Sequence, residues 1–347
     1  MLLQKLCAAR GVSGNEDAVR EILIEEIRPH VDEYRVDNIG NLIATVHAKE
    51  GVENPRRVMV AAHMDEVGLM IVQIGKDGML RFRTVGGVDA RVLPAKRVLV
   101  GEEAVPGVIG IKAAHLVSAE EEGQVIKVDQ LYIDIGAKSK EEAEGVVHVG
   151  DVASFVTTPR VLGRTMIGKA FDDRAGCAVL AELVKERYEI ELVAVFTVQE
   201  EVGLRGARVA SYEVDPELGF ALEGTICDET PRRVDLSPVT RMGQGPAITV
   251  MDRSTISDRR LVDLLVHVAT EAGIPYQFKS PGLGGTDAGA IHMAREGVPA
   301  IAVAAPVRFI HTPACFLSLD DFEHTVALMK ATLHRLPGDF AWGERRQ

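Results

Sequence analysis

The sequence predicts an α/β fold: a mostly parallel sheet flanked by helices, with a small β-barrel-like domain inserted into it. Apolar runs typical of buried strands alternate with helical patterns in residues 1–67 and again in residues 162–347. Between them, residues 68–161 contain short β runs separated by glycines, with a single helical segment at 140–145, which is typical of a small barrel or sandwich. A length of 347 residues is also about twice that of a usual single domain. We therefore predict two domains, with residues 68–161 as the insert.

The first 67 residues predict a helix, a hairpin and a buried strand. The helix spans residues 16–28, because SGNE (13–16) has the pattern of a capping box and Pro29 ends it. Residues 36–46 have the pattern of a hairpin turning at NIGN (38–41). Residues 58–62 are apolar without alternation, which indicates a strand buried on both faces.

The α/β alternation after the insert predicts three long helices and four strands. Since strands that alternate with helices pair in parallel, these strands should join the first one in a single sheet. Ser318 should cap the last helix, with Asp321 as its partner. The helices are expected at 174–187, 258–272 and 319–336, and the strands at 191–198, 218–222, 247–251 and 300–304.

The composition excludes several classes of function. A net charge of −12 argues against nucleic acid as a partner, and no apolar run approaches the length of a membrane span. The first residues, MLLQKL, lack the long apolar region of a signal peptide. The four cysteines lie far apart, with neither disulfide nor zinc spacing, so they are expected to be buried thiols in a reducing cytoplasm: Cys7, Cys177, Cys227 and Cys315.

A histidine and an aspartate follow the first buried strand. The apolar run stops at His63, and Asp65 lies two positions on. Ligands gather at the carboxyl ends of parallel strands, and a carboxylate that hydrogen-bonds the far ring nitrogen is the usual support of a metal-binding imidazole. A buried histidine that is merely hydrogen-bonded fits the same residues, so the other candidate ligands decide the question.

One more histidine and three acidic clusters lie at strand ends or at a helix start: Asp172, Glu200 with Glu201, Glu223, and His311. Each cluster alone is weak, since paired aspartates also suit a plain N-cap. Together, two histidines and several carboxylates suit zinc, cobalt or manganese. Five ligands are too many for one catalytic zinc but suit two ions about 3.5–4 Å apart.

The motifs resemble those of the dinuclear aminopeptidases of the tetrahedral (TET) type, a family that includes deblocking and glutamyl aminopeptidases. They are AAHMDEVG (61–68), KAFDDR (169–174), QEEVG (199–203) and FIHTP (309–313), and the similarity continues through the insert with VGGVDAR (85–91) and GVIG (107–110). The resemblance implies a zinc-peptidase type of fold and a cytosolic enzyme that releases N-terminal residues from peptides. It also implies that residues 1–67 and 162–347 form the catalytic domain, while residues 68–161 pair subunits into dimers of a hollow twelve-subunit particle.

The resemblance further implies two divalent metal ions per subunit, with zinc or cobalt ahead of manganese. It gives each candidate residue a role: Asp172 bridges the two ions, His63 and Glu223 complete one site, Glu201 and His311 complete the other, Glu200 is the general base that activates the bridging water, and Asp65 orients His63. One departure is Glu223, where many relatives carry aspartate, so this side chain is one methylene longer.

Two features of backbone geometry are expected around these residues. Neighbouring residues of a regular strand point to opposite faces, so the chain must leave strand geometry for Glu200 and Glu201 to serve one site, and Gly203 permits this. A cis peptide bond is expected between Asp172 and Asp173, as in related enzymes.

Two other functions are compatible with part of the pattern. A glycoside hydrolase would use Glu200 and a second carboxylate as an acid/base pair, and relatives have been labelled endoglucanases, but this leaves His63 and His311 without a role. A non-catalytic metal-binding scaffold would have little need of Glu200. The loop GLGGTDAG (282–289) lacks the lysine and hydroxyl ending of a phosphate-binding loop, and we expect it to contribute to a substrate pocket rather than to bind a nucleotide.

Overall fold

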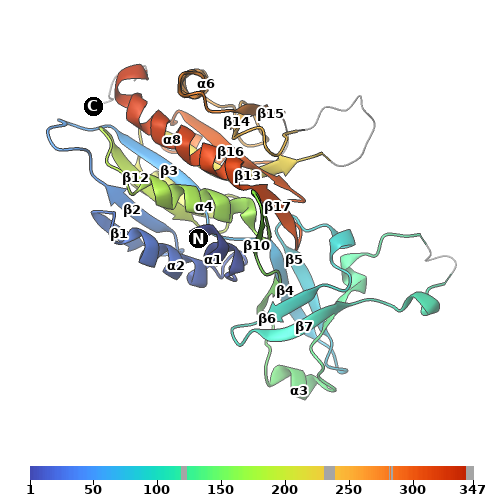
Figure 1. Cartoon of the computed structure of the whole chain (residues 1–347). Helices are drawn as coiled ribbons and strands as arrows, with labels where there is room; N and C mark the ends of the chain where they lie inside the picture. Colours follow the sequence, from blue (N-terminus) through green and yellow to red (C-terminus); the bar gives the residue numbers. More distant parts are fainter. Residues whose placement is uncertain (119–122, 230–238, 281, 283, 341–347) are drawn as a thin grey trace.

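The computed structural model describes residues 1–118, 123–229, 239–280, 282 and 284–340. Its larger part is built on one mixed sheet (Figure 1) whose four central strands are parallel and whose edges are extended by antiparallel strands. In order across the sheet, the strands are β1 (Glu33–Val36), β2 (Leu42–Val46), β12 (Glu191–Thr197), β3 (Arg57–His63), β13 (Leu218–Cys227), β16 (Ala300–Arg308), β17 (Cys315–Ser318), β11 (Thr165–Gly168) and β10 (Arg160–Leu162). Strand β14 (Ala247–Thr249) also pairs with β16, and β15 (Gln277–Lys279) pairs with β14.

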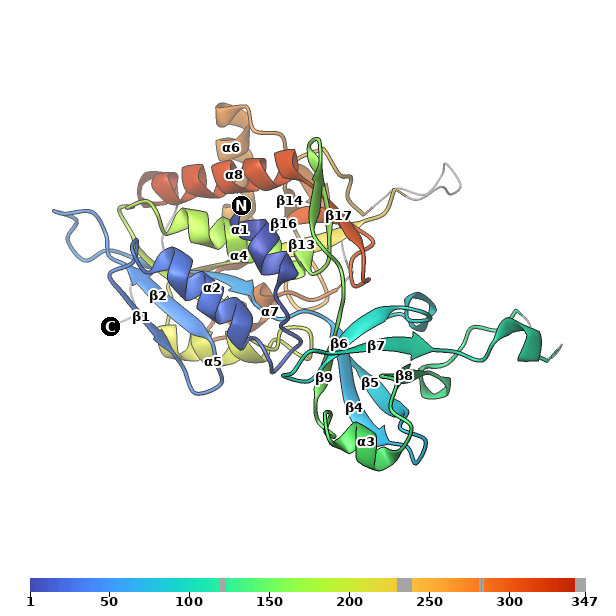
Figure 2. The ribbon, with the colours of Figure 1, turned by 60° about the horizontal axis from the view of Figure 1, so that its bottom comes forward.

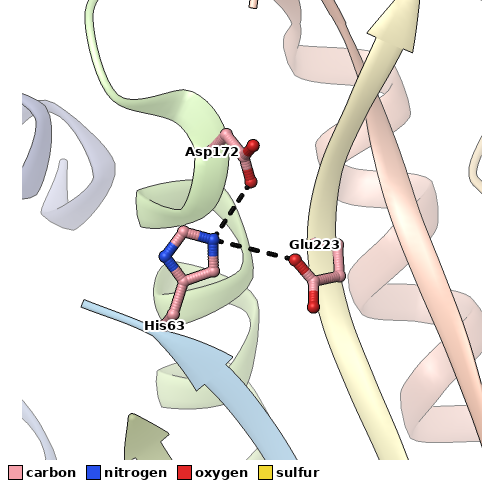
Figure 3. Close-up of side chains that lie close together, drawn as sticks. All are labelled: His63, Asp172 and Glu223. Atoms are coloured by element: carbon pink, nitrogen blue, oxygen red, sulfur yellow. Dashed lines mark hydrogen bonds and ion pairs between the residues drawn. The ribbon is translucent and has the colours of Figure 1, made fainter. Parts of the chain in front are cut away.

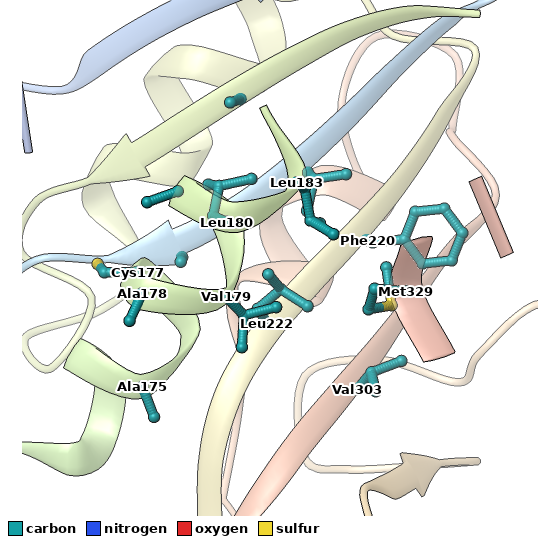
Figure 4. Packing of buried hydrophobic residues seen from close by; sticks show 14 of the residues in the cluster. Ala175, Cys177, Ala178, Val179, Leu180, Leu183, Phe220, Leu222, Val303 and Met329 are labelled. Carbon is teal, nitrogen blue, oxygen red and sulfur yellow. The ribbon is translucent and has the colours of Figure 1, made fainter. Parts of the chain in front are cut away.

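Helices cover both faces of this sheet, which explains the apolar strands. Along β3, Val58, Val60 and Ala62 belong to the core of one face, whereas Met59 and Ala61 belong to the core of the other. Figure 4 shows part of the first core, where side chains of α4 pack on β13 and β16. The helices of that face are α1 (Leu2–Ala8), α2 (Asp17–Ile27), α4 (Phe171–Leu183), α6 (Arg259–Ala272) and α8 (Leu319–Asp339), and those of the opposite face are α5 (Arg205–Val214) and α7 (Asp287–His292).

A closed six-stranded antiparallel barrel with its own apolar core lies to one side of the helix-flanked sheet (Figure 2). Its strands, in order around the barrel, are β4 (Gly68–Ile74), β5 (Leu80–Val85), β8 (Tyr132–Asp134), β7 (Val105–Gly110), β6 (Arg97–Val100) and β9 (Val152–Phe155). Its helical segments are η1 (Ala90–Val92), η2 (Ala114–Leu116), η3 (Val128–Gln130) and α3 (Lys140–Glu144).

The predicted fold class is confirmed: a helix-flanked sheet with a parallel centre carries an inserted barrel. The exact division of the chain at 67/68 and 161/162 stays a prediction. Ser318 caps α8 as expected, since its hydroxyl accepts a hydrogen bond from the Asp321 amide. All four cysteines are free and buried. No helix in the described ranges combines the length and apolarity needed to cross a membrane.

Two local predictions were wrong or incomplete. The capping box at residues 13–16 does not form, because the Ser13 hydroxyl donates to Asp65 instead and Glu16 makes no side-chain cap bond to α2. Helix α5 was not predicted from the sequence. Its buried positions include Gly206, Ala207 and Ala210, and such small side chains give only a weak apolar pattern.

Candidate metal centre

The first group of possible metal ligands contains His63, Asp172 and Glu223, which come from three different elements (Figure 3). His63 is the last residue of β3, Asp172 lies at the start of α4, and Glu223 lies within β13. The Nε2 atom of His63 is 3.2 Å from Oδ1 of Asp172 and 3.7 Å from Oε2 of Glu223. One ligand atom from each residue lies within 4.8 Å of the other two, so a single cation would reach all three.

The second group contains Asp172 again, with Glu201 and His311. The Nε2 atom of His311 is 3.2 Å from Oδ2 of Asp172 and 3.3 Å from Oε1 of Glu201. His311 lies in the loop between β16 and β17 and has a positive φ of 58°. Asp172 therefore turns one carboxylate oxygen towards each histidine, which is the arrangement expected of a carboxylate that bridges two ions.

A sharp change of backbone direction after β12 brings Glu200 and Glu201 to the same site. The strand ends at Thr197, and Gln199 has a left-handed φ of 56°. The expected departure from strand geometry is confirmed, although it begins before Gly203. Oε2 of Glu200 lies 3.9 Å from Nε2 of His63, so this carboxylate faces the first group without belonging to it.

Asp65 supports His63 and the Glu200–Glu201 turn together. Its Oδ1 atom lies 3.3 Å from Nδ1 of His63, while its two carboxylate oxygens accept hydrogen bonds from the Glu200 amide at 3.0 Å and the Glu201 amide at 3.2 Å. The side chain is fully buried. The Asp172–Asp173 peptide bond is cis, as predicted, and the Asp173 carboxylate accepts a hydrogen bond from the His63 amide.

The electrostatics of the two groups favour bound cations. Burial raises the pKa of Glu223 and of Glu200 well above the ordinary range; His63 opposes this, and neighbouring carboxylates add to the rise. Burial lowers the pKa of His311, but Asp172 and Glu201 outweigh it and raise the pKa to about 11. Oε1 of Glu201 is buried and faces Nε2 of His311 at 3.3 Å. Crowded, desolvated carboxylates around two imidazoles are stabilised when divalent cations neutralise them, so the donor set fits two such ions.

A small, partly open pocket lies beside the second group and is lined in part by Asp172, Glu201 and His311. Phe155 of the barrel strand β9 also lines it. A side chain added at Gly87, in the loop after β5, would meet the His311 ring at 3.2 Å. The barrel therefore forms part of the wall of the candidate site.

Two supporting features were missed in the sequence. The Asp287 amide donates to Oε1 of Glu223 at 3.0 Å, and the buried Asp287 carboxylate accepts from the Thr197 hydroxyl at 2.6 Å. The position of Asp287, at the start of a helix two residues after a glycine pair, was the available signal. Lys169 and Glu66 form a buried ion pair at 2.5 Å next to the site. Within the loop predicted at 282–289, residue 283 lies outside the described residues, and Gly285 and Gly289 pack against Ser254.

Three known proteins illustrate what the chain is similar to. A putative aminopeptidase of Acetivibrio thermocellus is 42% identical over 330 residues, which cover 94% of this chain and 96% of the relative. The crystal structure of a TET aminopeptidase from a marine sediment Thaumarchaeota archaeon matches with a TM-score of 0.91 at 37% identity, covering 96% of both chains. The Pyrococcus horikoshii TET1 peptidase, described as able to assemble into a tetrahedron or a large octahedral shell, matches with a TM-score of 0.86 at 37% identity, covering 96% of this chain and 99% of that one.

The family model described as M42 glutamyl aminopeptidase matches residues 40–328. This range contains both groups of possible metal ligands, the Glu200–Glu201 turn and the whole barrel. The match covers most of the chain, and the chain belongs to the M42 glutamyl aminopeptidase family.

Proposed function

We propose that the protein is an aminopeptidase that depends on two divalent metal ions and releases N-terminal residues from peptides. Membership of the family supports aminopeptidase activity, and the metal dependence rests on one observation above all. Asp172 turns its two carboxylate oxygens towards two separate histidines, and each histidine has a glutamate of its own.

His63, Asp172 and Glu223 would hold one ion, and Asp172, Glu201 and His311 the other. Two such ions supply a water of lowered pKa and polarise the scissile carbonyl. Zinc and cobalt are the ions that we expect, with manganese as a further candidate, because imidazole and carboxylate ligands without thiolates suit all three.

Glu200 is the proposed general base. It faces the first group but belongs to neither, so its carboxylate is free to take a proton from the attacking water and deliver it to the departing amine. The hydrogen bond from its backbone amide to the Asp65 carboxylate fixes the direction of the turn that carries Glu200. Asp65 also lies against Nδ1 of His63, which leaves Nε2 directed at the metal groups.

We also propose that subunits pair through the barrel and assemble into a particle of twelve in the cytoplasm. The likeness to the Pyrococcus horikoshii TET1 peptidase supports assembly, and the free, buried cysteines suit a reducing compartment. Light scattering coupled to gel filtration tests the assembly, and a monomer at micromolar concentration would refute it.

The decisive experiment compares the wild type with Glu200→Gln on a panel of aminoacyl-p-nitroanilides. Each protein is stripped of metal and reloaded with zinc or cobalt, and the bound metal is counted. We expect activity to return with metal in the wild type and to stay absent in Glu200→Gln with two ions bound. Glu103→Gln, at an exposed position of the barrel, is the matched control. Activity that survives metal removal, or an active Glu200→Gln, would refute the mechanism.

A further inference from the structure

The segment between α1 and α2 links the barrel, the strand β3 and the Glu200–Glu201 turn. The Arg10 guanidinium donates to the backbone carbonyls of Gly101 and Glu102 in the turn between β6 and β7. One residue further on, Gly11 exchanges hydrogen bonds with Glu66: its amide donates to the Glu66 carboxylate, and its carbonyl accepts from the Glu66 amide. These bonds fix the segment next to the crossing from the sheet to the barrel.

The end of this segment reaches the turn that carries the proposed general base. The Ser13 hydroxyl donates to Oδ2 of Asp65 at 2.5 Å. Oε1 of Glu16 accepts from the Gly14 amide at 2.7 Å and from the Gln199 amide at 3.2 Å. The contact between Glu16 and Gln199 joins residues 183 positions apart in the sequence.

Three consecutive amides of the turn thus donate to buried carboxylates. The Gln199 amide donates to Glu16, and the amides of Glu200 and Glu201 donate to Asp65. The β12 ladder has already ended at Thr197, so these three amides have no strand partner and need other acceptors. Without these acceptors, the partly buried amides would lose their partners.

A purely structural role for Glu16, as the N-cap of α2, does not account for its contacts. Its side chain makes no cap bond to the helix, and only 4% of the residue is exposed. Burial raises the pKa of Glu16 to about 7, although the hydrogen bonds that it accepts from backbone amides lower the pKa in part. A carboxyl group is costly to bury, and here it is buried against the turn rather than against the helix.

We propose that Glu16 is a positioning residue for catalysis: with Asp65, it fixes the backbone of residues 199–201 so that Glu200 and Glu201 face the two metal groups. This inference rests on the proposed function for its kinetic consequence. The geometry itself does not depend on it. Because both hydrogen bonds end on the same oxygen of Glu16, a glutamine amide oxygen at this position retains them, whereas a leucine of similar size removes them.

The test uses the full-length, metal-loaded enzyme with Glu16→Leu, Glu16→Gln and the control Glu21→Leu, whose glutamate lies exposed on the same helix. We expect Glu16→Leu to lower kcat by about 10- to 100-fold with little change in KM, since the base and not the substrate pocket is displaced. Glu16→Gln should keep kcat within about threefold of the wild type, as expected when the acceptor is retained. Glu21→Leu should match the wild type.

Hydrogen exchange of a peptide spanning residues 198–202 gives a readout that needs no activity. We expect faster exchange in Glu16→Leu and wild-type exchange in Glu16→Gln; if Glu16→Leu does not fold, Glu16→Ala replaces it in both measurements. The inference would be overturned if Glu16→Leu, which lacks the acceptor, kept the wild-type kcat and the wild-type rate of hydrogen exchange. It would also be overturned if Glu16→Gln were as impaired as Glu16→Leu. If the wild type cleaves no aminoacyl substrate, the proposed function fails, and the exchange data still decide the role of Glu16.

Discussion

Replacing Gly87 by alanine should weaken the binding of a metal ion at the group of ligands that contains His311. Gly87 does not have the positive φ that would by itself disfavour a side chain, so the effect of the substitution comes from the space it fills. An added Cβ would lie 3.2 Å from Nδ1 of His311 and 3.7 Å from Cε1. The imidazole must therefore move by a few tenths of an ångström, away from the barrel.

The magnitude follows from what His311 must keep in place. Its Nε2 atom lies 3.2 Å from Asp172 and 3.3 Å from Glu201, and a shift of the ring disturbs both distances. Perturbing the residues that orient a metal-binding histidine costs about 10- to 100-fold in affinity. Since only a small displacement is required, we expect the lower end for one of the two ions, about tenfold or 1.4 kcal/mol.

Titration of the metal-free protein against a chromophoric chelator for zinc measures both affinities. Gly145→Ala is the matched control, because it places the same methyl group in the barrel, 3.3 Å from the Glu142 carbonyl oxygen and distant from the site. For Gly87→Ala, we expect a lower affinity for one of the two ions and a lower kcat at limiting zinc. At saturating zinc, kcat should recover fully. Two wild-type affinities in Gly87→Ala would refute the idea that this loop positions His311.

Three further predictions concern stability. Lys169→Met should lower the free energy of unfolding by about 3 kcal/mol because it removes the nearer of the two cations that face the buried Glu66 carboxylate and leaves only Arg174, at 3.6 Å. Urea denaturation measures this loss, and Lys140→Met at an exposed pair should change little; equal effects would contradict the argument. Burial raises the pKa of Glu16 to about 7 from an ordinary 4.5, so between these pH values the folded state binds more protons than the unfolded state. As the pH rises through that window, the free energy of unfolding of the wild type should therefore fall by up to about 3 kcal/mol relative to that of Glu16→Gln. Denaturation at pH 4.5 and pH 8 checks this, and a constant difference would refute it. Zinc at about 100 times its dissociation constant should stabilise the metal-free protein by about 2.7 kcal/mol, and an unchanged melting temperature would argue against the metal groups.

The sequence was informative where the local pattern and the tertiary role coincide. The run at 58–62 is apolar without alternation because β3 packs on both faces, and the strand therefore showed both its burial and its end at His63. The glycine-punctuated β runs within residues 68–161 correspond to a barrel, in which each short strand has one inner apolar face. His63, Asp172 and Glu201 stand at or just beyond the end or start of such an element, where a change from apolar to charged residues is visible in a single chain. Glu223 does not, because β13 continues past the predicted end at residue 222 to Cys227.

The supporting residues were not predictable in this way, because their partners are set by tertiary contacts. Ser13 and Glu16 have the local pattern of a capping box, and nothing nearby in the sequence indicates that Asp65 and Gln199 compete for them. In the folded protein, Asp65 is fully buried, and a hydrogen bond from the Ser13 hydroxyl satisfies one of its carboxylate oxygens. A helix N-terminus at the surface can use water instead of a cap, whereas a buried carboxylate has no such substitute. The Ser13 hydroxyl therefore bonds the buried Asp65 carboxylate rather than the N-terminus of α2, and Glu16 bonds the Gln199 amide.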